Sequence, residues 1–125
     1  MQHYDNFING KFVPSTGKER IEVTNPSTGQ AICTVPESTA SDVETAVAAA
    51  EATQHAWAKR PAIERAKVLR ALAEKIRAHT ESLARVITEE QGKTLGLARV
   101  EVAFTADYLD YMAEWARRIE GEILE

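Results

Sequence analysis

The sequence is poor in cysteine, in aromatic residues and in long hydrophobic runs. One cysteine, Cys33, stands among 125 residues, which excludes an internal disulfide and a cysteine-rich zinc site. No apolar run approaches the roughly 18 residues that a membrane-spanning helix needs. Residues 1–5 show neither the basic nor the apolar region of a secretory signal. We therefore expect no membrane span and a cytoplasmic location.

Glycine-rich phosphate-binding motifs and metal-ligand spacings are also missing. The six glycines form neither a G-x-G-x-x-G motif nor a P-loop, so no cofactor-binding residue is expected in this chain. His3, His55 and His79 share no ligand spacing with one another or with Cys33. We expect His3 in a mobile terminus and the other two near helix ends. Cys33 has no activating neighbour in sequence, which favours a buried strand residue over a nucleophile.

The charge is slightly acidic and unevenly spread. The chain has 15 basic and 19 acidic residues, for a formal net charge of −4. Residues 59–77 hold seven basic and two acidic side chains, which fits either a nucleic-acid surface or the solvated face of an amphipathic helix. Residues 58–103 contain no aromatic side chain to stack on bases, and residues 81–125 hold ten acidic against five basic residues. We expect no nucleic-acid partner.

Residues 1–36 predict short strands joined by tight turns. Asn9-Gly10 stands between the apolar pairs Phe7-Ile8 and Phe12-Val13, the strongest short-range signal for a β-hairpin. Residues 21–23 alternate with period two before Asn25-Pro26, and residues 31–35 form a further apolar run that Pro36 ends.

Residues 37–125 predict about four helices. The first begins at Thr39 or Ser41, where Ser41-x-x-Glu44 fits a capping box. The second begins at Pro61, the third covers residues 81–91, with Gly92 ending it, and the fourth covers about residues 94–120. The expected inward positions are Val43, Ala46, Val47, Ala50 and Trp57 on the first helix, Ala62, Ala66, Leu69, Leu72, Ala73 and Ile76 on the second, and Leu83, Val86 and Ile87 on the third.

The fourth helix has apolar residues over an unusually wide arc. A helix that is apolar on more than one side is expected to be covered on more than one side, and three short helices with a small sheet cover one face at most. Its expected stripes are Phe104, Tyr108, Tyr111, Trp115 and Ile119 on one side, and Ala98, Val102, Leu109, Met112 and Ala116 on the other. The carboxylate pairs Glu89-Glu90 and Asp107/Asp110 on the last two helices read as surface charge.

Several segments, in one order, carry a resemblance to a known family. They are Phe7–Val13, Val23–Gly29, the strand into Val35-Pro36, the alanine-rich helix ending at Trp57, Pro61–Ala66, Glu89–Lys93, Val100–Arg118 and Glu120–Ile123. Together they resemble the N-terminal segment of NAD(P)-dependent aldehyde dehydrogenases, and the last two segments are most similar to the branch that acts on lactaldehyde and glycolaldehyde. The resemblance covers essentially the whole chain and implies an α/β fold class: the opening part of that family's fold, with short strands in residues 1–36 and helices in residues 37–125.

The resemblance implies a larger parent enzyme with a Rossmann-type coenzyme domain and a catalytic domain that these 125 residues do not contain. In the family a cysteine thiolate attacks the aldehyde, hydride passes to NAD, a glutamate activates water, and an asparagine amide helps to hold the oxyanion. All three catalytic residues lie beyond the matched region, and Cys33 corresponds to a strand position. We therefore expect no catalytic residue in this chain, no activity of the chain alone, and a homo-oligomeric parent.

The resemblance carries over one candidate site, for a monovalent cation. The matching positions are Val23 and Thr24, through backbone carbonyls, and Glu90, two residues before Gly92-Lys93. Such oxygen ligands suit hard cations. The alternative is that Glu90 is a solvated side chain at a helix end.

A second interpretation of the whole chain belongs to a different functional class. The chain could be a free-standing helical interaction or regulatory module that binds a protein partner through Phe104, Tyr108, Tyr111 and Trp115, because aromatic side chains on a rigid helix suit an interface. In the first interpretation the remainder of the enzyme, or another subunit, covers the fourth helix instead.

Overall fold

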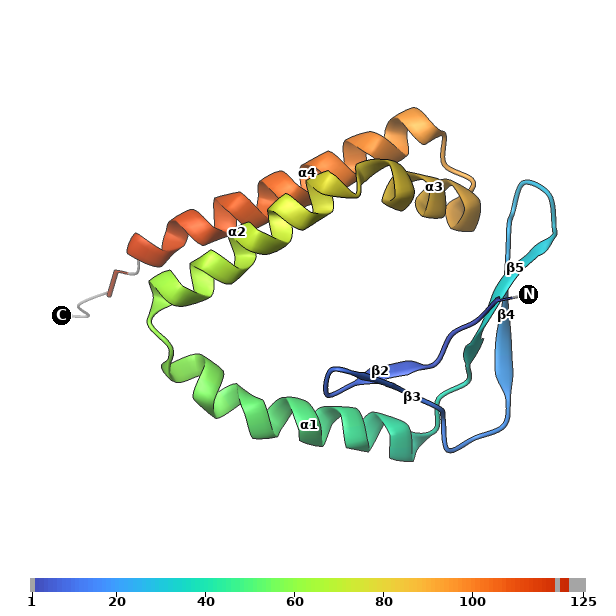
Figure 1. Ribbon diagram of the computed structural model, residues 1–125, viewed down its shortest axis with the longest axis horizontal. Helices are drawn as coiled ribbons and strands as arrows, with labels where there is room; N and C mark the ends of the chain where they lie inside the picture. Colours follow the sequence, from blue (N-terminus) through green and yellow to red (C-terminus); the bar gives the residue numbers. More distant parts are fainter. Residues whose placement is uncertain (1, 119, 122–125) are drawn as a thin grey trace. The chain divides into compact units, whose positions relative to one another are not determined.

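The computed structural model describes residues 2–118, 120 and 121 (Figure 1). Strands occupy the first part of the chain and helices the rest, as the sequence predicts. The chain divides into two compact units, Met1–Ala58 with Glu89–Gly92, and Lys59–Thr88 with Lys93–Glu125. We call them unit 1 and unit 2 and describe each by itself.

Unit 1 contains a three-stranded sheet and a separate hairpin. The sheet has the order β1-β5-β4, with β5 parallel to β1 and antiparallel to β4. The hairpin pairs Phe7 with Phe12 across the predicted turn, in which Asn9 and Gly10 have φ values of 50° and 77°. Two consecutive positive φ values are what a two-residue hairpin turn requires, which is why Asn-Gly suits it. The strands are β1 (Gln2–His3), β2 (Asn6–Ile8), β3 (Lys11–Val13), β4 (Arg20–Thr24) and β5 (Ala31–Pro36).

The expectation of a mobile terminus around His3 is wrong. Residues Gln2 and His3 pair with Cys33 and Thr34 of β5, and the His3 ring is hydrogen-bonded through Nδ1 to Thr34 Oγ1 at 2.7 Å. Arg20 Nε also donates to Thr34 Oγ1, at 2.8 Å. These contacts join residues 14 and 31 positions apart in the sequence, so a local sequence pattern does not reveal them.

The first helix, α1 (Ala40–Lys59), begins with a capping box two residues earlier than Ser41-Glu44. Thr39 N donates to Asp42 Oδ2 at 2.8 Å, and Asp42 N donates to Thr39 Oγ1 at 3.3 Å, the reciprocal pair that defines the motif. Asp42 is 6% exposed and accepts further hydrogen bonds from Ser15 Oγ (2.6 Å) and Thr16 N (3.0 Å). These hydrogen bonds confirm Thr39, rather than Ser41, as the residue that caps α1. Asp42 also anchors the loop between β3 and β4 through Ser15 and Thr16.

The face of α1 that the sequence predicts to be inward is largely exposed. Val43, Val47 and Trp57 are 55%, 60% and 37% exposed, and the buried residue of this helix among those described is Asp42. The periodic pattern correctly predicts a helix, but unit 1 covers this face only in part, with Ala46 half-buried beside the β2–β3 hairpin.

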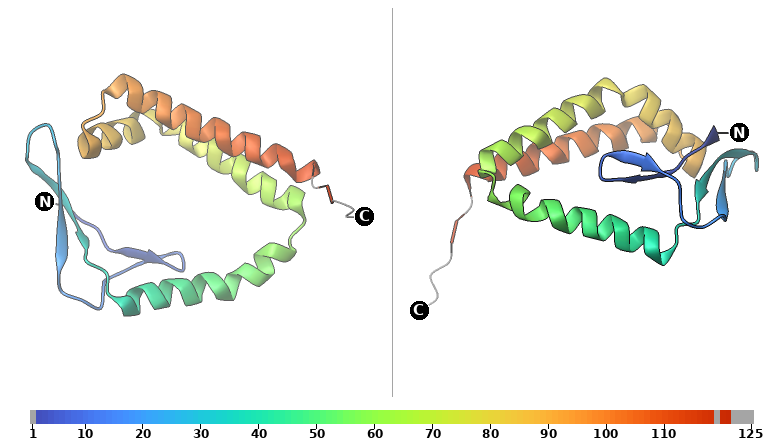
Figure 2. Two further views of the ribbon diagram at one scale, coloured as in Figure 1. Left: turned by 180° about the vertical axis from the view of Figure 1, so that it is seen from behind. Right: turned by 60° about the horizontal axis from the view of Figure 1, so that its bottom comes forward.

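Unit 2 is built on two helices, α2 (Ala62–Ala78) and α4 (Leu95–Glu114), which run side by side in every view (Figures 1 and 2). Small side chains line the contact, which allows the two backbones to approach closely. The buried residues are Ala66 and Ala73 on α2, and Ala98, Val102, Ala106 and Ala113 on α4.

The third helix, α3 (Thr80–Gln91), adds Ala84 to a small apolar cluster with Ala98 and Val102, flanked by Ile76, Ile87 and Leu95. Of the residues predicted to face inward on α3, Ile87 does so, whereas Leu83 and Val86 are 38% and 48% exposed. On α2, Leu72 is likewise 45% exposed. The described core therefore consists of small residues, and no large side chain in the described part of the chain is fully buried.

The fourth helix is shorter than predicted. It changes at Trp115 into a 3₁₀ turn, Trp115–Arg117, and Gly121 lies beyond its end. Such a tightened last turn commonly ends an α-helix. The predicted second stripe is also inexact, because Ala106 and Ala113 are buried while Met112 is 39% exposed. Ile119 of the first stripe, and Glu122 and Ile123 of the matched segments, lie outside the described residues. None of the described helices has the length and apolar character that crossing a membrane requires.

Candidate functional site

The candidate cation ligands Val23 and Thr24 lie at the end of β4, where the ladder with β5 is irregular. Val23 is opposite Cys33 and Thr24 is opposite Ala31, so a β-bulge falls between the two pairs. The extra residue is Ile32 of β5, which stands between the partners of Val23 and Thr24 and is left without a paired residue on β4.

The turn that follows β4 is tightly organised around Asn25. Asn25 Oδ1 accepts from Ser27 N at 2.9 Å, and the Asn25 carbonyl accepts from Gly29 N at 2.7 Å. Gly29 has a φ of 71°, so it takes the left-handed conformation that glycine adopts without strain. The Asn25-Pro26 motif thus fixes the direction in which the chain leaves the bulge.

Residues 89–92, at the C-terminal end of α3, pack against this turn within unit 1. Gly92 has a φ of 72°, as its predicted role in ending the helix requires. A Cβ at Gly92 would lie 3.2 Å from Pro26 Cγ and 3.3 Å from Ser27 Oγ. The structure therefore brings the segment that carries Glu90 to the turn that follows Val23 and Thr24.

Glu90 itself is exposed, as is Thr24, while Val23 is partly buried. Two backbone carbonyls and one carboxylate are donors that suit a hard monovalent cation. The donor types therefore suit such an ion, and Gly92, two residues after Glu90, lies against the turn that follows β4. The described residues contain no cluster of three or more His, Cys, Asp or Glu side chains suited to a metal ion.

The other candidate residues, Cys33, His55 and His79, lie in a strand, in a helix and at a helix end. Cys33 is 5% exposed in the middle of β5, which confirms that it is a packed strand residue. His79 ends α2, and its Nδ1–H donates to the Lys75 carbonyl at 2.8 Å. His55 lies within the last turns of α1.

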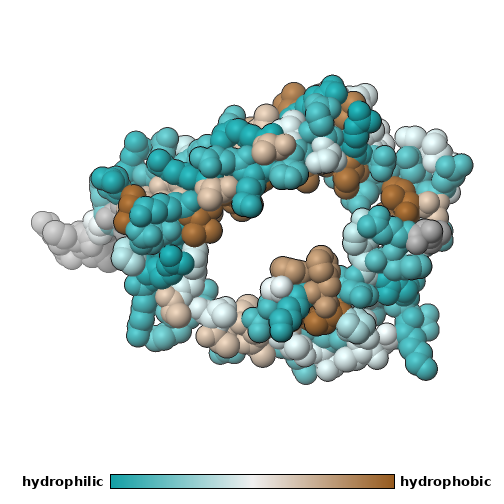
Figure 3. Space-filling view, viewed as in Figure 1, coloured by the Kyte–Doolittle hydropathy of each residue, from teal (hydrophilic) through white to brown (hydrophobic). Residues whose placement is uncertain are grey.

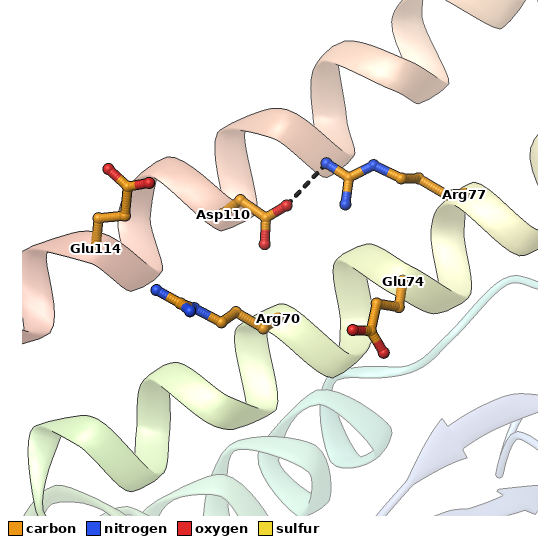
Figure 4. A pocket seen from close by; sticks show the side chains of 5 residues that line it. All are labelled: Arg70, Glu74, Arg77, Asp110 and Glu114. Atoms are coloured by element: carbon orange, nitrogen blue, oxygen red, sulfur yellow. Dashed lines mark ion pairs between the residues drawn. The ribbon is translucent and has the colours of Figure 1, made fainter.

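The carboxylate pair Asp107/Asp110 on α4 forms ion pairs with Arg77 on α2. Its guanidinium reaches both carboxylates at 2.8 Å, which holds α2 against α4 and raises the pKa of Arg77, first through Asp107 and then Asp110. Figure 4 shows the contact with Asp110 beside a polar surface pocket of about 340 Å³. The pocket is lined by Arg70, Glu74, Arg77, Asp110 and Glu114.

A second ion pair ties α3 to α4. Arg99 Nε and Nη2 donate to Glu81 Oε1 and Oε2 at 2.7 and 2.9 Å, and Arg99 lowers the pKa of Glu81. Lys93 pairs with Glu101 at the start of α4. The basic side chains Arg77, Lys93 and Arg99 therefore have acidic partners within the fold, so their charges serve ion pairs between elements of the structure. The sequence shows both signs of charge but not which residues pair across helices.

None of the described glycines with positive φ lies between a strand and the N-terminus of a helix. The described glycines with positive φ, Gly10, Gly29 and Gly92, lie in the hairpin turn, in the turn after β4 and after the end of α3. A pyrophosphate site needs glycines between a strand and the N-terminus of a helix. At α1, the helix that follows a strand, the carboxylate of Asp42 already accepts the N-terminal backbone donor of Thr39.

Large apolar side chains reach the surface of both units (Figure 3). In the hairpin, Phe7 and Phe12 are 64% and 69% exposed and meet edge to face at 5.0 Å. On α4, the predicted aromatic stripe is present on the outside: Phe104, Tyr108, Tyr111 and Trp115 are 69%, 51%, 50% and 45% exposed. The described chain thus does not cover this stripe.

Comparison with known proteins places these features in a family. Residues 12–125 match the aldehyde dehydrogenase family. Lactaldehyde dehydrogenase of Escherichia coli (strain K12) is 50% identical over 95% of this chain and 25% of that protein. Mitochondrial succinate-semialdehyde dehydrogenase of Oryza sativa subsp. japonica is 40% identical over 94% of the chain and 22% of that protein.

Solved structures give the same result. The crystal structure of lactaldehyde dehydrogenase from Escherichia coli matches with a TM-score of 0.94 and 48% identity, over 98% of this chain and 26% of that one. A structure of 3,6-anhydro-L-galactose dehydrogenase in complex with NAP matches with a TM-score of 0.93 and 33% identity, over 99% and 26%. The likenesses confirm the predicted α/β fold class and favour the family interpretation over a free-standing module. The chain spans about a quarter of the length of the relatives it matches, and it belongs to the aldehyde dehydrogenase family.

Proposed function

We propose that this chain is the N-terminal segment of the coenzyme domain of an NAD-dependent aldehyde dehydrogenase that oxidises a small hydroxyaldehyde, such as lactaldehyde or glycolaldehyde, to the carboxylate. The observation that carries the proposal is the 50% identity with a lactaldehyde dehydrogenase over 95% of the chain, against 40% with a succinate-semialdehyde dehydrogenase. A nicotinamide cofactor is supported by neighbours that include a complex with NAP and an NAD-dependent aldehyde dehydrogenase.

In this proposal the segment supplies a scaffold and no catalytic group. Cys33 is packed inside β5, and the described glycines do not form a nucleotide-binding turn. When bound elsewhere in the parent enzyme, NAD would accept a hydride. The 125 residues contribute strands and helices that pack against the rest of the enzyme. The exposed aromatic stripe on α4 supports this role, because further protein would cover it.

Two assays test the proposal. The 125-residue chain, mixed with NAD and lactaldehyde, is expected to produce no NADH, and production of NADH would refute the scaffold role. If the reading frame continues beyond the Glu125 codon, the longer protein is expected to have a higher kcat/KM for lactaldehyde or glycolaldehyde than for succinate semialdehyde, and with NAD than with NADP. A preference for succinate semialdehyde would overturn the substrate assignment and leave the family intact.

We also propose that Val23, Thr24 and Glu90 contribute to a monovalent cation site. The packing of Gly92 on the turn after β4 supports it, because this contact brings the segment that carries Glu90 to the end of β4. In the longer protein, Glu90→Gln is expected to weaken the stabilisation that K⁺ provides relative to a bulky organic cation, measured as a shift in Tm. Glu89→Gln, its exposed neighbour, is the matched control. Equal responses of both variants, or no density beside Glu90 after soaking with Rb⁺, would contradict the site.

The resemblance further supports a cytoplasmic homo-oligomer, in which the remainder of the enzyme or another subunit covers α4. Light scattering of the longer protein tests the oligomer, and a monomer at micromolar concentration would contradict it. Cell fractionation tests the location.

A further inference from the structure

We draw no further inference here: the strongest candidate, the exposed apolar face that Phe104, Tyr108, Tyr111 and Trp115 form along α4, carries nothing because nothing in the structure shows what covers it.

Discussion

The contact between α2 and α4 depends on small side chains, and Ala106 tests this directly. Ala106 is fully buried on α4, and α2 is the helix along which α4 packs. Changing Ala106 to leucine adds three carbon atoms to this position. If there were room for them, their burial would stabilise the fold by roughly 2.4 kcal/mol, at about 0.8 kcal/mol for each carbon.

We expect the opposite, a loss of about 1–3 kcal/mol, because a closely packed interface must move apart to admit the larger side chain. Ala103→Leu is the matched control, since Ala103 lies on the exposed side of the same helix. Its effect is expected to stay within about 0.5 kcal/mol. The free energy of unfolding is measured by urea denaturation with tryptophan fluorescence. If Ala106→Leu were as stable as the control, the alanines would not set the distance between the helices.

The remaining predictions concern two glycines, a buried carboxylate and an ion pair. Gly29→Ala is expected to cost about 1–2 kcal/mol for its positive φ alone, and Gly92→Ala more, because its Cβ also meets the turn after β4; equal losses in urea denaturation would show that this contact is loose. Hydrogen bonds from Ser15 and from the backbone of the capping loop hold the pKa of Asp42 far below its usual 3.8. The stabilisation from Asp42 is therefore complete above about pH 4 and is lost as the pH falls towards the folded-state pKa. Asp42→Asn should lower Tm at pH 7 and reduce the fall in Tm below pH 4, and an unchanged acid profile would argue against the network. Arg99→Gln should lower Tm at low salt and much less in 1 M NaCl, since the Arg99–Glu81 pair is exposed; a salt-independent loss would point to packing instead.

Local rules predict the hairpin turn and the end of α3 well. Asn9-Gly10 and Gly92 each take the positive φ that their positions require, and this preference is a property of the residue and its immediate neighbours. The start of α1 shows the limit of such rules. Thr39-x-x-Asp42 and Ser41-x-x-Glu44 both fit a capping signature, and the choice depends on hydrogen bonds from Ser15 and Thr16, which are distant in sequence.

Predicting which apolar residues are buried works less well. Periodicity identifies the helical face but not whether another element covers it, so Val43 and Val47 are exposed despite their spacing. Alanine carries little hydrophobic signal, yet Ala84 and Ala106 are fully buried. Only the resemblance suggests the candidate cation site. The irregular pairing at Val23 and the packing of Gly92 depend on tertiary contacts, which local sequence rules do not show.

The spacing of the small residues on α4 creates an ambiguity in register. Ala98, Val102 and Ala106 follow one another at intervals of four, so sliding α4 by one helical turn along α2 would again place small side chains at the contact. In one direction that slide would put Ala103 and Ala106 where Asp107 and Asp110 lie, and Arg77 would lose both carboxylates. An exposed ion pair that adds little to stability can therefore decide which of several similarly packed alignments the two helices adopt.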